Sequence, residues 1–143
     1  MPEQNYQNHA RVVPLYHYGV FLTLLAYFVW GAWQLVQGVS LASAMTFILS
    51  IALIFMAFSL RSQVLTVQDR VIRLEMRLRM RDVLPADLAA RGSELPIKQL
   101  VALRFASDTE LAHLVTEVLE GRLKEIKEIK ARVKDWQGDF LRA

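Results

Sequence analysis

The feature that most constrains this chain is a run of 49 residues, 12–60, that contains no Asp, Glu, Lys or Arg. A helix that crosses the hydrocarbon core of a bilayer, about 30 Å thick, needs about 20 apolar residues. The run is long enough for two such helices, and residues 15–36 and 41–60 are the predicted spans. The residues between them, 37–40, predict a turn, with Gly38 as the helix breaker. A connection this short makes the two spans antiparallel neighbours.

The positive charges near the spans predict their orientation. The turn carries no charge, whereas Arg11 precedes the first span and Arg61, Arg70 and Arg73 follow the second. Because Arg and Lys accumulate on the cytoplasmic side, both termini are predicted to be cytoplasmic. A signal peptide is disfavoured because the first apolar stretch is too long and no small-residue cleavage site follows it.

The basic character of the chain is confined to one segment next to the second span. Residues 61–81 hold six Arg against two acidic residues, whereas residues 82–143 hold ten Lys and Arg against eleven Asp and Glu. The position of the segment makes its arginines partly a topology signal, and acidic protein or anionic lipid is a better expected partner than nucleic acid. The arginines predicted to bind such a partner share one helical stripe: Arg70, Arg73, Arg77 and Arg81.

The second span is predicted to continue as one helix through residues 61–83, because no helix breaker occurs before Pro85. Apolar residues recur along this segment at intervals of three and four, which is the pattern of two coiled-coil heptads. Ile72, Met76 and Met80 widen the apolar side beyond that seam. The seam predicts a helix-packing surface, and its residues are Val64, Val67, Val71, Leu74 and Leu78.

Residues 84–143 predict a small cytoplasmic bundle of helices. Two prolines begin short helices, and Ser107 with Glu110 predicts a capping box at the start of the next helix. The last helix is predicted over residues 122–143, where apolar residues form one narrow stripe. This stripe predicts a docking surface near the C-terminus, made by Ile126, Ile129, Val133, Trp136 and Phe140.

These segments together predict an all-α membrane protein. A polar tail (1–13) precedes a two-helix transmembrane hairpin (14–60), whose second helix extends into the cytoplasm as a juxtamembrane basic helix (61–83). A cytoplasmic helical domain (84–143) follows.

Small and hydroxyl-bearing residues predict how the hairpin packs. Such side chains let membrane helices approach closely, in a solvent where hydrophobicity does not drive association. The pattern predicts contact between the two spans, with contact to an oligomer or a partner chain as the alternative. The predicted helix-packing residues are Gly19, Thr23 and Gly31 on the first span and Ser43, Thr46 and Ser50 on the second.

The sequence lacks the local motifs that mark common catalytic and metal-binding sites. The chain has no Cys, no phosphate-cradling Gly-rich loop, no HExxH and no nucleophile elbow. We therefore predict no enzyme activity, no catalytic or metal site and no cofactor. His17 could ligate haem or a pigment, but its place between two tyrosines at the end of a span favours interfacial anchoring. Four acidic residues near one another are assigned to helix capping and solvation rather than acid–base catalysis: Asp108, Glu110, Glu117 and Glu120.

Four stretches carry a resemblance to a known family and together cover nearly the whole chain. They are QNYQNHARVVPLYHYG (4–19), LTVQDRVIRLEMRLR (65–79), LVALRFASDTEL (100–111) and KEIKARVKDWQGDFLRA (127–143). With these stretches the chain resembles a bacterial family of short two-span membrane proteins that is catalogued as a domain of unknown function. The resemblance implies the bacterial inner membrane, and it implies no activity, cofactor or site residue.

The leading functional hypothesis is a non-enzymatic, membrane-anchored accessory or scaffold protein that docks to itself or to a larger inner-membrane complex. One alternative is a small subunit of a bioenergetic membrane complex that carries a cofactor or pigment at His17. Another is a protein that binds anionic lipid through its arginine stripe. The lipid hypothesis requires the helix to bend near the membrane, because a straight helix carries Arg81 about 30 Å past the second span, beyond a Debye length of about 8 Å.

Overall fold

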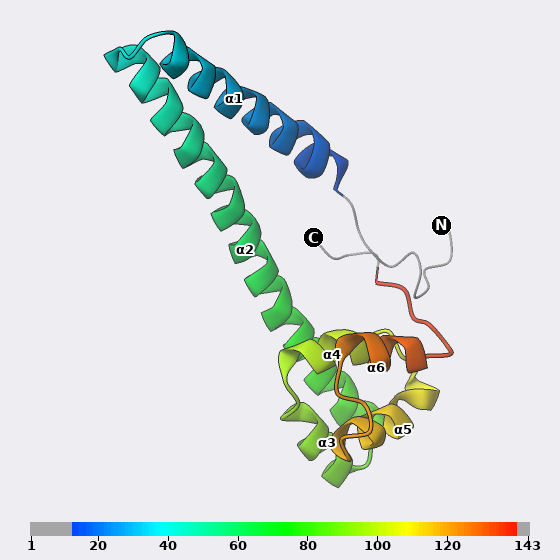
Figure 1. The fold of residues 1–143 in the computed structure, drawn as a ribbon. Coiled ribbons are helices and arrows are strands. Elements are labelled where there is room, and N and C mark those ends of the chain that lie inside the picture. The colour runs from blue at the N-terminus through cyan, green and yellow to red at the C-terminus, as the bar shows by residue number, and fades with distance from the viewer. Residues whose placement is uncertain (1–12, 140–143) are drawn as a thin grey trace. The chain divides into compact units, whose positions relative to one another are not determined.

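A computed structural model describes residues 13–139, which hold six α-helices, one π-helical turn and no strand (Figure 1). The chain divides into two compact units, which we call the hairpin unit (13–65) and the C-terminal unit (66–139). Helix α2 (Leu41–Val83) contributes residues to both units. The predicted polar tail lies outside the described residues, except for its last residue.

The hairpin unit consists of a π-helical turn (Leu15–Val20), helix α1 (Phe21–Gln37) and the first part of α2, which runs antiparallel to α1 (Figure 1). The helical stretches Leu15–Gln37 and Leu41–Val83 are both long and apolar enough to span a membrane, with mean hydropathies of 1.6 and 2.3 over their most apolar windows. Only 6% and 11% of these windows is buried. The apolar side chains of the hairpin therefore point mostly outward.

The connection between α1 and α2 satisfies its own polar groups. The backbone amide of Ser40 donates to Oγ of Ser43 (2.9 Å), and the amide of Ser43 donates to Oγ of Ser40 (3.1 Å). Oγ of Ser43 also lies 3.1 Å from the carbonyl oxygen of Gly38. This reciprocal cap pairs backbone donors that the first turn of a helix otherwise leaves without a partner.

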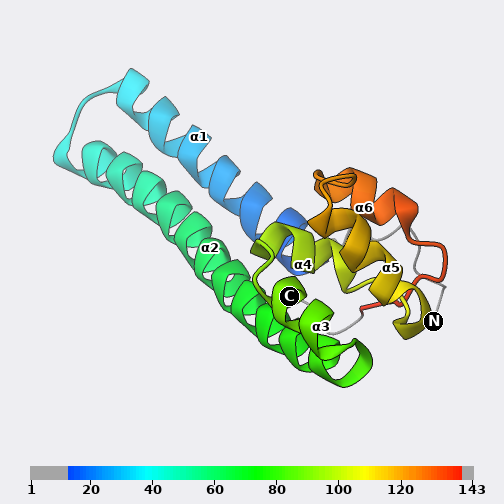
Figure 2. The same ribbon diagram turned by 90° about the horizontal axis from the view of Figure 1, so that it is seen from below.

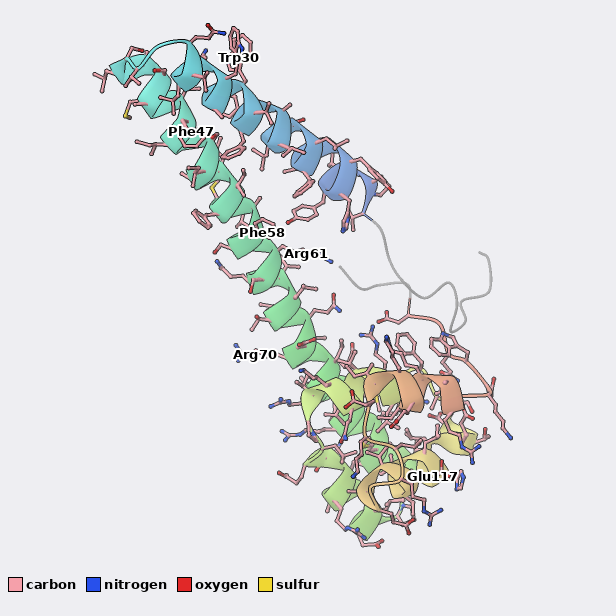
Figure 3. The ribbon with its side chains drawn as sticks, viewed as in Figure 1. Trp30, Phe47, Phe58, Arg61, Arg70 and Glu117 are labelled. Carbon is pink, nitrogen blue, oxygen red and sulfur yellow. The ribbon has the colours of Figure 1, made fainter. Side chains whose placement is uncertain are left out.

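The two helices of the hairpin approach each other closely at Gly31 of α1 and Phe47 of α2, and Figure 3 labels Phe47. Gly31 is buried, and a Cβ atom there would lie 3.2 Å from Cα of Phe47, so a larger residue would push the helices apart. The ring of Phe28 lies 5.3 Å from that of Phe47. Nearer the N-terminus, the hydroxyl of Tyr16 donates to the carbonyl oxygen of Ala57 (3.3 Å).

The predicted small-residue surface divides between the inside and the outside of the hairpin. Ser43 and Ser50 are buried, as is Gly31, and Thr46 is half-buried with its hydroxyl bonded to the carbonyl oxygen of Ala42. Gly19 and Thr23 are exposed, and the Thr23 hydroxyl donates to the Gly19 carbonyl within the same helix. Packing between the two helices therefore does not account for Gly19 and Thr23.

The C-terminal unit packs four short helices around the last turns of α2 (Figure 2). Its centre consists of fully buried aliphatic and aromatic side chains from α4, α5, α6 and the segment after α4, including Leu100, Leu103, Phe105, Leu111 and Ile129. The helices are α3 (Ala86–Ser93), α4 (Ile97–Leu103), α5 (Asp108–Leu119) and α6 (Ile126–Arg132).

Helix α2 enters this core through Ile72, Met76 and Met80, which are 3%, 2% and 0% exposed. Their spacing of four residues places them on one face of the helix. Helix α3 approaches closely at Gly92, where a Cβ atom would lie 3.0 Å from Sδ of Met80 and 3.1 Å from Cγ1 of Val115. The packed face of α2 is thus the one that was predicted only to widen the apolar side of the seam.

Arg79 joins α2 to the segment between α4 and α5. Its Nη1 and Nη2 donate to the carbonyl oxygens of Arg104 (3.2 Å) and Ala106 (2.7 Å), and its Nε donates to the carboxylate of Asp108 (2.7 Å). One guanidinium therefore satisfies two carbonyl groups near the end of α4 and an acidic residue in the first turn of α5.

The predicted helix over residues 122–143 is wrong in extent. Helix α6 ends at Arg132, and the chain continues in an extended form in which Trp136 pairs with Ala106 by a single β-bridge. The Trp136 ring stacks on Phe105, with 4.6 Å between ring centroids. The proposed C-terminal docking stripe is therefore no single helical face: Ile129 is fully buried, Ile126, Val133 and Trp136 are half-buried, and Phe140 lies outside the described residues.

The predicted capping box at Ser107 and Glu110 is also wrong. Ser107 occupies the N-cap of α5, but its hydroxyl bonds to Thr109 and caps no backbone amide. The carboxylate of Glu110 instead accepts from the backbone amides of Lys134 (3.1 Å) and Asp135 (3.3 Å). A capping box does occur at the start of α6, between Glu125 and Glu128.

We predict that Arg79→Met destabilises the C-terminal unit by roughly 2 kcal/mol, because it leaves two carbonyl groups and a carboxylate without their donor. Chemical denaturation of the full chain in detergent, followed by near-UV circular dichroism, measures the change. Arg73→Met is the matched control, since Arg73 is exposed on the same helix, and it should change stability by less than about 0.5 kcal/mol. Equal effects of the two substitutions would contradict the role assigned to Arg79.

Candidate functional site

The main candidate site is the seam that the sequence predicted along α2. All its members are exposed, by between 43% and 61%, while the bundle packs on Ile72, Met76 and Met80. At about 100° per residue, the centre of the seam lies about 160° round the helix from the centre of that packed face. The structure thus leaves the seam uncovered within the described residues: Val64, Val67, Val71, Leu74 and Leu78.

The seam holds most of the exposed apolar surface of the C-terminal unit. Among residues 66–139, five large hydrophobic side chains are exposed, and four of them are Val67, Val71, Leu74 and Leu78. The fifth, Val83, lies elsewhere on the helix. Exposed apolar side chains scattered singly need no explanation, but a continuous row of them marks an interaction surface.

The predicted arginine stripe runs along one side of the seam. Arg70, Arg73, Arg77 and Arg81 are all exposed, and Figure 3 shows Arg70 on α2. Nε of Arg77 donates to the carbonyl oxygen of Ser93 (3.1 Å), and Nε of Arg81 lies 3.7 Å from the carboxylate of Asp82. These contacts leave the stripe at the surface of the unit, beside the apolar row.

An open groove of about 540 Å³ adjoins the C-terminal end of the seam. Leu78, Arg77 and Arg81 of α2 form one side, and the alanines of α3, with Ser93 and Glu94, form the other. The groove combines small apolar side chains with basic groups. It extends the surface of the seam onto α3.

In the hairpin unit, two apolar clefts lie beside Tyr16. One, of about 190 Å³, is lined by Phe21, Leu25, Ile54 and Phe58, among others, and the second, of about 350 Å³, reaches Arg61. Their linings are almost wholly hydrocarbon, and the guanidinium of Arg61 lies 5.8 Å from the centre of the Tyr16 ring. Such clefts suit acyl chains or apolar side chains of a neighbouring helix.

His17, the candidate cofactor ligand, lies in the π-helical turn before α1. Its Nδ1 is 2.9 Å from the carbonyl oxygen of Val13 and 3.1 Å from the amide nitrogen of the same residue. The ring is half-buried and meets the ring of Tyr16 edge to face, at 5.3 Å. The imidazole is therefore engaged by its own helix terminus and by an aromatic neighbour.

Each of the four acidic residues considered for acid–base chemistry makes a contact within the C-terminal unit. Asp108 binds Arg79, Glu110 binds two backbone amides, and Glu120 pairs with Arg122. Asp108 is exposed and also bonds to Arg79, whereas Glu110 makes a tertiary contact instead of the predicted cap. Among residues 13–139 no group of three His, Cys, Asp or Glu side chains could hold a metal ion.

Glu117 is the acidic residue with the most distinct environment. It is buried on α5 (Figure 3), and both its carboxylate oxygens accept from Arg132 of α6, at 3.2 and 3.3 Å. The hydrogen bond from Arg132 lowers the pKa of Glu117 and outweighs the partial desolvation that acts in the opposite direction. The same bond raises the pKa of Arg132. The pair holds α6 against α5, which is a structural role.

The family model of DUF6526, described as a family of unknown function, matches residues 1–143. The chain belongs to this family. No curated protein and no solved structure matches the chain. DUF6526 membership supplies no activity or ligand, so functional inference depends on the surfaces described above.

Sequence reasoning missed the long-range polar contacts of the C-terminal unit, namely those of Arg79, Glu110 and Glu117. A signal for Arg79 existed in the sequence. Arg79 lies seven residues after Ile72 and three after Met76, so it belongs to the face that packs against the bundle. No comparable local signal identifies Glu110 or Glu117, because their partners are 15 or more residues away along the chain.

We predict that acid weakens the C-terminal unit partly through Glu117. Its pKa is lower in the folded chain, so the Glu117–Arg132 pair stabilises the fold above the ordinary carboxyl pKa of about 4.5. That contribution is lost as the pH falls through the lower, folded-state pKa. Glu117→Gln should therefore reduce stability at pH 7 and make stability less sensitive to acid, as measured by denaturation of the full chain between pH 3 and 7.

The control for this experiment is Glu120→Gln, since Glu120 pairs on the surface with Arg122, two residues along the chain. Exposed pairs of this kind contribute little to stability. A pH profile of Glu117→Gln that coincides with that of the unmodified chain would contradict the role of the pair.

Proposed function

We propose that this protein is a non-enzymatic scaffold of the bacterial inner membrane. In this proposal the hairpin unit anchors the chain in the bilayer, both termini are cytoplasmic, and the C-terminal unit presents a docking surface to a second copy of the chain or to a larger inner-membrane complex. The surface is the α2 seam, together with the arginines beside it.

This proposal rests on the presence of two apolar faces on α2, one packed in the core and one exposed. One face already holds the bundle through Ile72, Met76 and Met80, so the exposed row on the opposite face is not needed for folding. Leaving such a row in water is unfavourable, by about 25 cal/mol for each Å² of apolar surface that a partner would cover. A helix in a water-soluble unit that keeps an apolar row on its outer face is therefore best explained by a protein that covers it.

The membrane part of the proposal is supported by length, hydropathy and charge. The apolar side chains of both proposed spans point outward, which is favourable in lipid and unfavourable in water. The turn at 38–40 is uncharged, while six arginines follow the second span within residues 61–81. By the rule that positive charge stays on the cytoplasmic side, the turn faces away from the cytoplasm.

We predict that single cysteines will report this topology, since the chain has no cysteine of its own. In spheroplasts, Val39→Cys should react with a membrane-impermeant maleimide added from outside, because Val39 is exposed on the turn. Lys98→Cys, at an exposed position of α4, should react only after the membrane is opened. Labelling of Lys98→Cys in intact spheroplasts, or labelling of Val39→Cys only after lysis, would contradict the topology.

We predict that the double substitution Val71→Asn with Leu74→Asn prevents the partner from binding to the seam. The fold and membrane insertion should not change. Burying an aliphatic side chain contributes about 1.5–3 kcal/mol, so two lost contacts should weaken docking at least tenfold. Chemical cross-linking of native membranes, followed by detection of the chain, measures the loss of the larger cross-linked species.

Val83→Asn is the matched control for the seam variant, because Val83 is an exposed valine of α2 outside the seam. It should keep the cross-linked species of the unmodified chain. An identical set of cross-linked species from all three chains would contradict docking through the seam.

A further inference from the structure

We propose that the partner that covers the α2 seam is a second copy of this chain, in a parallel, in-register, two-stranded coiled coil. This inference rests on the proposed function and names the occupant of the same surface. The observation behind it is the arrangement of charge on the two sides of the seam.

The seam follows a heptad pattern without interruption. Val64, Val71 and Leu78 occupy the first apolar position of successive heptads, and Val67 and Leu74 occupy the second. A β-branched residue at the first position combined with Leu at the second, as at Val71 and Leu74, favours two strands.

Opposite charges lie on opposite sides of this seam. At about 100° per residue, Arg70 and Arg77 lie on one side of Val71 and Leu74, and Glu75 and Asp82 lie on the other. All four charged residues are exposed. In heptad terms the arginines precede the first apolar position and the acids follow the second, and these are the positions whose side chains meet across a parallel coiled coil.

This arrangement is complementary to itself. In a parallel pair, Arg70 of each copy faces Glu75 of the other, five residues further along, and Arg77 faces Asp82 by the same rule. A two-fold axis repeats each pair, so the interface would contain four ion pairs between unlike charges. An antiparallel pair does not bring these positions together.

The membrane anchor selects the parallel arrangement. Two copies inserted with the same topology have α2 leaving the bilayer in the same direction and starting at the same depth. Two heptads are short for an isolated coiled coil in water. Anchoring two chains in one membrane raises their effective concentration, and so allows a weak interface to form.

Two features limit the interface at its C-terminal end. Arg81 occupies the apolar position that follows Leu78, so the apolar row ends there, and its guanidinium pairs with Asp82 of the same chain. Arg77 also donates to Ser93. Both contacts involve exposed side chains, and exposed pairs of this kind exchange at little cost.

Disulfide formation in membrane vesicles that contain the full chain tests self-association directly. Leu74→Cys should form a disulfide-linked dimer at least tenfold faster than Lys98→Cys, because the second apolar positions of the two copies face each other across the axis. Lys98 is exposed on α4 and away from the seam. Equal rates for the two variants would overturn the proposal.

A charge-exchange series in the Leu74→Cys background tests the predicted register. Arg70→Glu with Arg77→Glu makes both sides acidic, and Glu75→Arg with Asp82→Arg makes both sides basic. Each variant alone should lose most of its disulfide-linked dimer. The two variants co-expressed, or all four substitutions combined in one chain, should restore it, which also shows that the substituted chains fold. The proposed register is wrong if the all-acidic and all-basic variants still form the dimer. It is also wrong if the combinations fail to restore the dimer.

The outcomes separate this inference from the function it rests on. If Leu74→Cys couples to a different protein and not to itself, as the mass of the adduct shows, the scaffold proposal stands and self-association is wrong. If Leu74→Cys couples to nothing and Val71→Asn with Leu74→Asn changes no cross-linked species, docking through the seam is wrong as well. If dimer formation depends on the anionic lipid content of the vesicles and not on the charge exchange, the arginines bind lipid and the proposed ion pairs do not form.

Discussion

The packing of Ile72, Met76 and Met80 against the bundle is the contact on which the C-terminal unit depends. Four helices of 7 to 12 residues each are too short to form a stable core by themselves. By resting on α2, they gain a long, regular helix as one wall of that core. Arg79 secures the same face with three hydrogen bonds, so that one stripe of α2 supplies both the apolar and the polar part of the attachment.

Because the bundle occupies only that stripe, the opposite face of α2 remains available. The seam and its charged sides can therefore be considered separately from folding. A substitution on the seam should act on association, whereas a substitution at Met80 or Arg79 should act on stability. This separation makes the docking surface open to experiment, since the two kinds of effect can be measured apart.

Much of the helical framework could be predicted from the sequence, and the limits of the prediction have physical causes. The uncharged run, the turn after Gln37 and the continuous helix through residues 61–83 follow from local composition, which is why two long apolar helices were expected. The choice between the two apolar faces of α2 could not be made locally. Heptad spacing favoured the seam, but the bundle packs on the face that contains two flexible methionines, which fill irregular space well.

The end of the chain shows the same limit. Residues 126–140 have helical periodicity, yet α6 stops at Arg132 because Trp136 gains more by stacking on Phe105 and pairing with Ala106 than the helix would gain by continuing. Glu110, predicted as a cap, instead holds the backbone of that extended segment. Contacts between residues far apart in the sequence decided these points, and no spacing rule within one segment could have revealed them.

The cap formed by Ser40 and Ser43 has a consequence for how the hairpin could enter a membrane. Only three residues, 38–40, separate the two helices, so neither helix can cross the bilayer without the other. A backbone group that passes through hydrocarbon without a partner costs several kcal/mol. Since the two serines already bond to each other's amides and to the Gly38 carbonyl, the leading end of the hairpin carries fewer unpaired polar groups than an uncapped turn would. In the proposed membrane arrangement, the two helices would therefore insert together as one preassembled hairpin.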